Sequence, residues 1–446
     1  MGSRLAALCL ALCTLAVSVS AVAERIDGQH AGGARWAIER PEPWNGTLLL
    51  YSRGYTPTRS NAPPETAPRE LHDALLAQGY ALAASSYSGV GWALEEAPRD
   101  QVEVLDAFVA HFGAPRRTIA WGNSMGGLVT LALAERHADR FTGALSVCGS
   151  VSGSLGMLNT ALDGAWVFRT LLAPDSDIRV VNIDDDRTNS ARVQSVLEQA
   201  WQSPQGRARV MFAAAVAQLP LWTDGSLKEP PSDEDAQAEQ VRRTFALGTF
   251  VPRTDQERRA GGTTSWNAGV DYAKQLEASG RAALVRRWYA RAGLDLDADL
   301  AQLATTPRIT ADAPAVAWLR ANFVPSGDLR IPVLTMQTIG DGLTVPATHG
   351  SLRRTVGEAG RTKMLAQIWV NGAGHCTFTP AELGAALHTL ERRIDKSRWE
   401  TSSRSLAHAG EGLPGGTRFT HYDAPGLLRH CGAKPGSCKG EPGAGE

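Results

Sequence analysis

A short segment built around one serine constrains this chain more than any other feature. Residues 117–131 read as the apolar run Ile119-Ala120-Trp121, the pattern Gly122-x-Ser124-x-Gly126, and then an apolar stretch with helical spacing. A serine between a buried strand and a helix sits on a strained bend, and only glycine leaves room on both sides. The pattern therefore predicts a sharp strand-to-helix turn; an ordinary glycine turn is the alternative in a chain with 45 glycines.

Such a turn gives the serine and its neighbour chemical roles. The bend lifts the serine Oγ out of the sheet, and the N-terminus of the following helix faces the reacting carbonyl. The Met125 N–H then points at the oxyanion that forms when the hydroxyl attacks. We therefore expect Ser124 to be the nucleophile of a serine hydrolase, with Met125 as one oxyanion donor.

A serine hydroxyl is a poor nucleophile until a base takes its proton, and a carboxylate must hold that base in one tautomer. His375 follows a predicted strand and a Gly-x-Gly loop that can carry an imidazole back over the serine. Asp341 ends the preceding strand in a glycine-flanked loop. We expect these two residues to complete the set. His349 is the competing base, and a plain turn aspartate is the alternative for Asp341.

Strand-like apolar runs alternate with helical patterns on both sides of the serine. This alternation is typical of an α/β fold with a mostly parallel, doubly wound sheet, which binds ligands at the carboxyl ends of its strands. Ser124, Asp341 and His375 all follow such runs. Besides the strand before Ser124, the predicted strands span residues 47–52, 80–85, 143–148, 331–337 and 364–370.

The chain order serine, aspartate, histidine resembles that of the α/β-hydrolase superfamily and differs from the chymotrypsin and subtilisin orders. The resemblance runs from about Trp44 to Ile394 and implies the α/β-hydrolase fold. It also implies that the second oxyanion donor follows the strand at 47–52. There Arg53-Gly54-Tyr55 replaces the family's His-Gly-x, so the Tyr55 N–H is the expected donor.

The aspartate and histidine loops look like those of secreted bacterial esterases. Tannases and feruloyl esterases carry a cysteine directly before the serine, bridged to one directly after the histidine. Cys376 matches the second of these positions, but Asn123 stands at the first. The resemblance to that subfamily is therefore partial.

Four cysteines lie beyond the N-terminal segment: Cys148, Cys376, Cys431 and Cys438. Four cysteines allow three pairings. The short Gly/Pro-containing loop between Cys431 and Cys438 favours a bridge there, which leaves Cys148 to pair with Cys376. Two unpaired buried thiols are the alternative for that second pair.

The pattern divides the chain into five parts. Residues 1–23 form a signal peptide, 24–150 and 329–400 form the two parts of the α/β-hydrolase core, and 401–446 form a tail with a cysteine loop. Residues 151–328 lack alternating strands and predict a helical cap or lid inserted over the site. Within it, Asp184–Asp186 is expected to be a solvated turn, with calcium binding as the alternative. The last residues, 440–446, are expected to be disordered.

The first residues predict an exported protein. Arg4 precedes an apolar run from Leu5 to Val19, and Ala21-Val22-Ala23 provides a cleavage site after Ala23. No later stretch reaches the roughly 18 unbroken apolar residues of a spanning helix. We therefore expect a secreted or periplasmic protein without a stable membrane anchor.

The charge balance and the motifs of the chain indicate which kinds of binding partner to expect. The 45 basic and 46 acidic residues nearly cancel, so no long-range field favours nucleic acid. No C-x-x-C or H-E-x-x-H pattern predicts a metal, and no cofactor is expected. A small-molecule ester or peptide is the expected partner.

The predicted reaction is hydrolysis of a carboxylic ester through an acyl-enzyme. Tyr87, Trp92 and Trp121 are candidate pocket residues, with a place in the core as the alternative for each. A secreted prolyl or tripeptidyl aminopeptidase is the second hypothesis, in which Glu95-Glu96 or acids of the cap grip the substrate amine; a solvated helix start explains Glu95-Glu96 equally well. A noncatalytic binding protein and an acyltransferase are further hypotheses. The sequence leaves the acyl group, the alcohol, the cap motion and the oligomeric state open.

Overall fold

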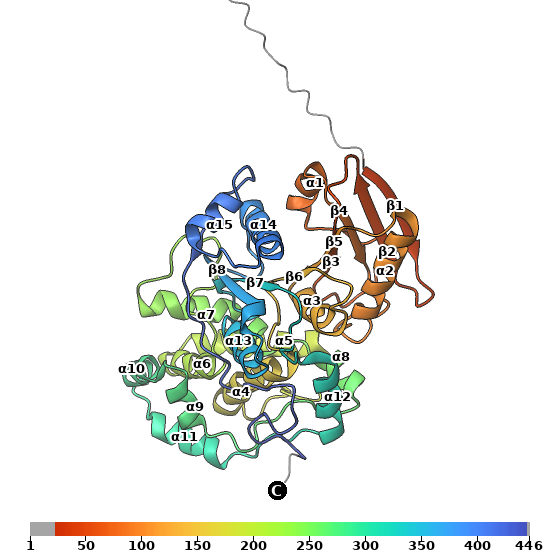
Figure 1. Cartoon of the computed structure of the whole chain (residues 1–446). Coiled ribbons are helices and arrows are strands. Elements are labelled where there is room, and N and C mark those ends of the chain that lie inside the picture. The colour runs from red at the N-terminus through yellow and green to blue at the C-terminus, as the bar shows by residue number, and fades with distance from the viewer. Residues whose placement is uncertain (1–22, 444–446) are drawn as a thin grey trace, which may run out of the picture.

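The protein, described here by a computed structural model over residues 23–443, is built on a nine-stranded sheet of order β1-β2-β4-β3-β5-β6-β7-β8-β9 (Figure 1). Strands β3 to β8 run parallel, and β1, β2 and β9 pair antiparallel at the two edges. The predicted mostly parallel sheet is confirmed. The strands are β1 (Ala23–Gln29), β2 (Arg35–Pro41), β3 (Thr47–Ser52), β4 (Ala81–Ser85), β5 (Arg117–Asn123), β6 (Gly143–Val147), β7 (Val333–Gly340), β8 (Leu365–Ala373) and β9 (Phe419–Thr420).

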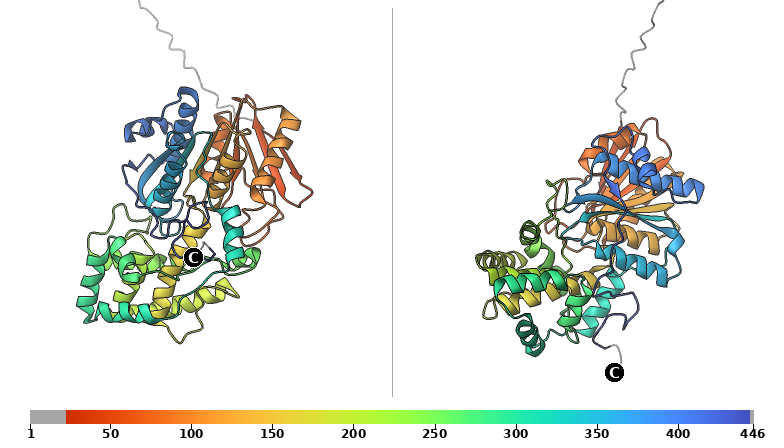
Figure 2. Two further views of the ribbon diagram at one scale, coloured as in Figure 1. Left: turned by 60° about the horizontal axis from the view of Figure 1, so that its bottom comes forward. Right: turned by 90° about the vertical axis from the view of Figure 1, so that its left-hand side faces the viewer.

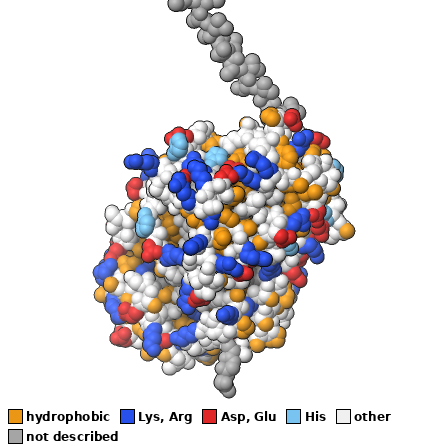
Figure 3. Space-filling model, viewed as in Figure 1, with side chains coloured by type: hydrophobic (Ala, Val, Ile, Leu, Met, Phe, Trp, Pro, Cys, Tyr) orange, Lys and Arg blue, Asp and Glu red, His pale blue; other side chains and the backbone are white. Residues whose placement is uncertain are grey.

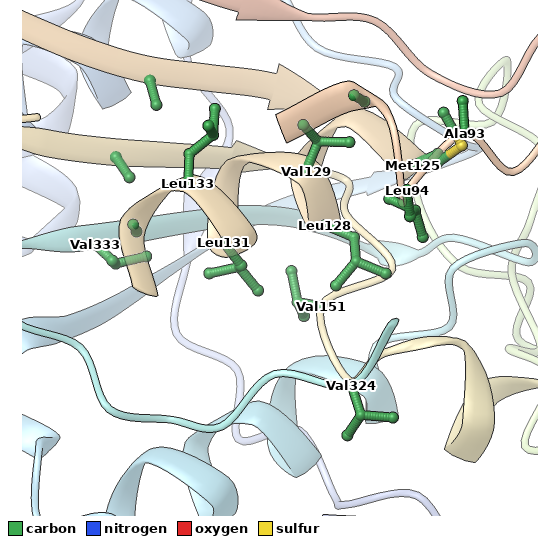
Figure 4. Close-up of a cluster of buried hydrophobic side chains, with 14 of the residues drawn as sticks. Ala93, Leu94, Met125, Leu128, Val129, Leu131, Leu133, Val151, Val324 and Val333 are labelled. Atoms are coloured by element: carbon green, nitrogen blue, oxygen red, sulfur yellow. The ribbon is translucent and has the colours of Figure 1, made fainter. Parts of the chain in front are cut away.

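Helices cover both faces of the sheet, which explains why the central strands are apolar throughout rather than alternating. In β3, Leu48 and Leu50 pack on one face with α2 and α3, whereas Leu49 and Tyr51 pack on the other with α1 and α14. Figure 4 shows the first face, where Leu128 and Leu131 of α3 point away from the sheet towards Val151. The helices of this core are α1 (Arg69–Ala77), α2 (Ala97–Phe112), α3 (Met125–Arg136), α13 (Ala347–Glu358), η1 (Thr362–Met364), α14 (Pro380–Lys396) and α15 (Ser403–Ala409).

The chain between β6 and β7 forms a helical insertion, residues 154–323, which lies beyond one end of the sheet (Figure 2). It has a hydrophobic core of its own, in which α4, α6 and α7 pack around Trp166, Phe168, Phe212 and Phe245. Its helices are α4 (Ser154–Leu172), α5 (Asp186–Trp201), α6 (Pro204–Val216), α7 (Glu234–Thr249), α8 (Thr254–Ala260), α9 (Tyr272–Ala278), α10 (Ala282–Ala292), α11 (Leu296–Thr305) and α12 (Ala313–Phe323).

The C-terminal tail runs over the insertion and joins it to the core. Arg429 binds Asp163 of α4, and the Leu427 N–H donates to Ser351 of α13 at 2.9 Å. Farther on, Glu441 forms a buried ion pair with Arg320 of α12. The expectation of disorder from residue 440 is therefore wrong for 440–443, because this ion pair orders them; residues 444–446 lie outside the described part.

The predicted signal peptide falls on residues 1–22, which are outside the described range, except for Ala23, the first residue of β1. From residue 23 to 443, no helix combines the length and the apolar character needed to cross a bilayer. Positive and negative side chains are interspersed on the face shown in Figure 3. Cys148 pairs with Cys376 and Cys431 with Cys438, both at disulfide distance.

Candidate active site

Ser124 lies on the bend between β5 and α3, with φ 56° and ψ −125°. A positive φ is strained for a residue with a side chain, and such strain is concentrated at functional sites. The glycines around it are sterically required. A Cβ on Gly126 would lie 2.0 Å from the Ser52 carbonyl oxygen, and one on Gly122 would lie 2.5 Å from the same atom. The two glycines thus let α3 cross directly over the end of β3.

His375 reaches the serine from the loop after β8. Gly374, with φ 89°, turns the chain at this point. The Ser124 Oγ lies 2.9 Å from His375 Nε2, and His375 Nδ1 lies 2.8 Å from Asp341 Oδ2. With Nδ1–H donating to the aspartate, Nε2 is left to accept the serine proton. The structure therefore brings together the three side chains that the sequence grouped.

Asp341 is fully buried and is held on both of its oxygens. Its Oδ1 accepts from the backbone N–H groups of Leu343 at 2.8 Å and Thr344 at 3.0 Å, and Oδ2 accepts from the Thr344 hydroxyl. Burial by itself lowers the pKa of His375. The charge and hydrogen bond of Asp341 outweigh that effect, so the pKa is raised above its usual value.

Thr344 is a residue of this site that the sequence did not single out. Its Oγ1 lies 2.8 Å from Asp341 Oδ2, 3.0 Å from the Cys148 carbonyl oxygen and 3.4 Å from His375 Nδ1. It therefore joins the aspartate loop to the end of β6. The only sequence feature that could have indicated Thr344 was its position three residues after Asp341. Many serines and threonines in turns share such a position.

The loop after β3 approaches the serine closely. A Cβ on Gly54 would lie 3.2 Å from the Ser124 Cβ, so the backbone of this loop passes beside the nucleophile. Arg53 supports it: Nη1 donates to the Gly54 carbonyl at 3.1 Å and Nη2 to the Ser86 carbonyl at 2.6 Å. The guanidinium also stacks on the Tyr87 ring at 4.5 Å. Met125 begins α3, so its N–H is one of the unpaired donors at that helix N-terminus.

The aromatic candidates occupy different places. Tyr87 is buried behind the loop that follows β3, and its hydroxyl donates to the Arg53 carbonyl. Trp92 is buried against the Tyr55 ring, 5.7 Å between centroids, and its indole N–H donates to the Pro252 carbonyl. Trp121 packs on Tyr51 in the core between the sheet and α1 and α14. Trp121 is thus a core residue, since its place in β5 turns it away from the helical insertion.

The competing histidine, His349, makes its contacts in the core and not with Ser124. His349 lies on α13, fully buried, with its ring 5.3 Å from that of Trp369 and its Nδ1 bonded to Thr335. Burial lowers its pKa to about 3. It is a neutral core histidine.

All of the acidic candidates except Glu95 bond within the protein. Glu96 binds Arg259 of α8 at 2.7 Å, and Glu95 is exposed. Asp185 caps α5 by accepting from the Thr188 N–H, and Asp186 accepts from the N–H groups of Arg253 and Thr254. Between residues 23 and 443, no group of three or more acidic, histidine or cysteine side chains could hold a metal ion.

The helical insertion packs directly on the aspartate loop. A Cβ on Gly342 would lie 2.2 Å from the Thr244 Oγ1 of α7, and one on Gly248 would lie 2.4 Å from the Gly342 carbonyl oxygen. Nearby, the Trp222 carbonyl oxygen would lie 2.3 Å from a Cβ on Gly340. Glycines at these positions let the two parts meet backbone to backbone beside Asp341. Ser124 and His375 are nevertheless partly exposed.

Comparison with known proteins agrees with this architecture. The family model described as alpha/beta hydrolase fold matches residues 62–219, which include Ser124. An o-phthalyl amidase of Xanthobacter agilis is 28% identical over 410 residues, which cover 84% of this chain and 88% of the relative.

Two solved structures are also similar. Feruloyl esterase B from Aspergillus oryzae has a TM-score of 0.46 at 12% identity, with 84% of this chain and 81% of that chain covered. The rice cell wall degrading esterase LipA from Xanthomonas oryzae has a TM-score of 0.37 at 15% identity, with 84% and 90% covered. The family match and the sheet order described above together show that the chain has the α/β-hydrolase fold.

Proposed function

We propose that this protein is a serine hydrolase that cleaves a carboxylic ester through a Ser124, His375 and Asp341 triad. One observation carries the proposal: the Ser124 Oγ is 2.9 Å from His375 Nε2, and His375 Nδ1 is 2.8 Å from a buried Asp341. A hydrogen bond between a serine and a histidine alone is equally compatible with a structural role. A continuous chain from a strained serine to a buried carboxylate matches the requirements of nucleophilic catalysis.

In this mechanism His375 takes the Ser124 proton as Oγ attacks the carbonyl carbon. Asp341 stabilises the imidazolium that forms, and its own orientation is fixed by Leu343 and Thr344. The Met125 and Tyr55 N–H groups hold the oxyanion, with Arg53 keeping the second loop in place. His375 then protonates the leaving group, and water attacks the acyl-enzyme by the same steps in reverse.

An amide substrate is the second candidate, and a specific observation favours it. The Xanthobacter agilis relative, named as an o-phthalyl amidase, matches this chain over most of both lengths. The triad chemistry serves either bond, because His375 can protonate an amine as well as an alcohol. The aminopeptidase hypothesis is weaker, because Glu96, one of the two expected amine ligands, is paired with Arg259.

The helical insertion is proposed to be the cap of this site. Its contacts with Gly340 and Gly342 put it beside the aspartate loop, and the partly exposed Ser124 and His375 leave a route for substrate. Export is part of the same proposal. The two cysteine pairs suit an oxidising compartment.

The test compares the protein from Glu24 onward with its Ser124→Ala variant on p-nitrophenyl esters, aryl anilides and aminoacyl p-nitroanilides. Ser60→Ala, at an exposed serine, is the matched control. We expect ester or anilide turnover to disappear with Ser124→Ala alone, together with fluorophosphonate labelling. Turnover of aminoacyl anilides only would favour the peptidase. Failure of the parent protein to react with fluorophosphonate would contradict the hydrolase and favour a binding protein.

A further inference from the structure

The arginine that begins the loop after β3 carries a charge that no acid neutralises. Within residues 23–443, Arg53 forms no ion pair, and its guanidinium lies over the Tyr87 ring at 4.5 Å. Burial lowers the pKa of Arg53, and Tyr87 opposes that change. Tyr87 supplies no countercharge, because burial raises the pKa of its hydroxyl to about 12. A partly buried cation without a carboxylate is unfavourable, which points to a use for the charge.

The guanidinium binds two backbone carbonyls from two different loops. Nη2 donates to the Ser86 carbonyl at 2.6 Å, which fixes the side chain against the loop after β4. Nη1 donates to the Gly54 carbonyl at 3.1 Å. The neighbouring Tyr87 has a φ of 60°, a strained value for a residue with a side chain, and its hydroxyl donates to the Arg53 carbonyl at 3.3 Å. Arg53 is thus held in place from both sides.

The Gly54 carbonyl and the Tyr55 N–H belong to one peptide unit. Because that unit is planar and trans, the two groups point in opposite directions. Arg53 binds the carbonyl end, whereas the Tyr55 N–H has no acceptor among the described residues. A Cβ on Gly54 would lie 3.2 Å from the Ser124 Cβ and 3.7 Å from its Oγ. The unit therefore begins beside the nucleophile, with its N–H left free for another group.

A cationic donor on the carbonyl oxygen changes the N–H end of the same peptide. It withdraws electron density, so the amide hydrogen becomes more positive, and hydrogen bonds linked in this way strengthen one another. In the proposed reaction the Ser124 Oγ bonds to the substrate carbonyl carbon, its proton passes to His375 Nε2, and the π electron pair moves onto the carbonyl oxygen. A stronger donor to that oxygen stabilises the transition state more than the bound substrate, and so raises kcat.

We propose that Arg53 polarises the Gly54–Tyr55 peptide, so that its positive charge strengthens the hydrogen bond from the Tyr55 N–H to the oxyanion. Arg53 does not touch the substrate. It is a positioning residue that acts through the peptide it binds, and its charge is part of that action. This inference rests on the proposed function and adds a source of positive charge to the oxyanion site.

The loop has other supports, so variants of Arg53 should remain folded. The Gly91 N–H donates to the Thr56 carbonyl at 2.8 Å, and the Tyr55 ring packs on that of Trp92. Thermal unfolding of each variant checks this. The path of the loop can therefore be separated from the charge that Arg53 brings to it.

The first test compares three variants on a p-nitrophenyl ester. Arg53→Lys keeps a charged donor, Arg53→Gln keeps a neutral donor, and Arg53→Met keeps neither. We expect Arg53→Met to lower kcat roughly 10- to 100-fold, less than the loss of a whole oxyanion donor, with KM changed by less than about threefold. Arg53→Gln should resemble Arg53→Met, whereas Arg53→Lys should recover part of the loss. Arg59→Met, at an exposed arginine that binds the Ser88 carbonyl, is the matched control and should change neither constant.

The second test measures the oxyanion itself. An aryl trifluoromethyl ketone, labelled with ¹³C at its carbonyl, should form a hemiketal with Ser124, and NMR titration gives the pKa of the hemiketal oxygen. We expect Arg53→Met to raise this pKa by about 1–2 units, the same factor as the loss in kcat. A change in the fold alone does not move this pKa in step with kcat.

The inference is overturned by an unchanged kcat in folded Arg53→Met, by full recovery in Arg53→Gln, or by a hemiketal pKa that stays constant while kcat falls. Turnover that depends on Ser124 but not on Arg53 would leave the proposed function standing. Failure of a fluorophosphonate to label Ser124 in the parent protein would remove both.

Discussion

Cys376, the residue after His375, is bonded to Cys148 at the end of β6, 228 residues earlier in the chain. Their Cα atoms are 5.3 Å apart. At the same end of β6, the Cys148 carbonyl accepts a hydrogen bond from the Thr344 hydroxyl. The histidine loop and the aspartate loop are thus both tied to one strand end, beside the serine turn.

We predict that the double variant Cys148→Ser and Cys376→Ser loses stability and activity together. A bridge closing so long a loop contributes about 3–5 kcal/mol to the free energy of unfolding. The freed histidine loop should lower kcat roughly tenfold or more, because small displacements of a catalytic base are costly. Urea unfolding and ester turnover measure the two effects. Cys431→Ser with Cys438→Ser is the control; a similar kcat loss there would contradict a specific role for the first bridge.

The pH dependence should follow the protonation of His375. In the proposed mechanism His375 must be neutral to accept the serine proton, so activity should be present above its pKa and be lost as the pH falls through that pKa. Because Asp341 raises that pKa, the acidic limb of the kcat/KM profile should lie above about 6.5, the usual value for histidine.

Asp341→Asn removes the charge that raises the pKa. We expect the acidic limb to move to lower pH while kcat falls by about 10⁴, as the wrong tautomer is favoured. Thr335→Val, which removes the partner of the remote His349, is the control. An acidic limb that stays in place in Asp341→Asn would show that another group limits the rate.

Gly126→Ala should disrupt the serine turn. Its Cβ would lie 2.0 Å from the Ser52 carbonyl oxygen, which belongs to backbone in the middle of the sheet and cannot yield. We expect a loss of at least about 3 kcal/mol in stability and of nearly all turnover. Gly357→Ala in α13 is the matched control, since the nearest atom to its added Cβ is Thr362 Cγ2 at 3.9 Å, an ordinary van der Waals contact, and helical alanine is favoured by about 1 kcal/mol. Thermal unfolding of both variants tests the contrast.

The core around the site could be predicted from the sequence because its signals are local. The serine turn is encoded by steric need at Gly122 and Gly126, and the strands by continuous apolar runs such as that of β3. The hairpin of β1 and β2 was missed, because its mixed charged and apolar residues belong to an edge of the sheet. The short α15 and the helix α13 were also missed.

Residues that act across long separations could not be predicted. Thr344 and Arg53 act through contacts with residues that are distant in the sequence. The pattern of charges along the chain does not distinguish the exposed Arg258 from the buried Arg253 five residues before it. Tertiary packing decides whether a charged side chain is buried, and the hydrophobic periodicity of the sequence does not show it.

The tail offers a last test, through the buried ion pair of Arg429 with Asp163. Both side chains are almost fully buried, and Tyr272 and Gln275 also bond to the aspartate, at 3.1 Å each. Burial raises the pKa of Asp163, and Arg429 opposes that rise. Arg429→Met leaves the carboxylate buried without its cation, so we expect a loss of about 3–5 kcal/mol in stability.

Combining Arg429→Met with Asp163→Asn should recover much of the stability that Arg429→Met loses. In the double variant Asp163→Asn with Arg429→Met no charge remains buried, and the amide can keep its bonds to Tyr272 and Gln275. Urea unfolding of the parent, both single variants and the double variant gives the coupling directly. Strictly additive losses would mean that the tail is held by Leu427 and its neighbours rather than by this ion pair.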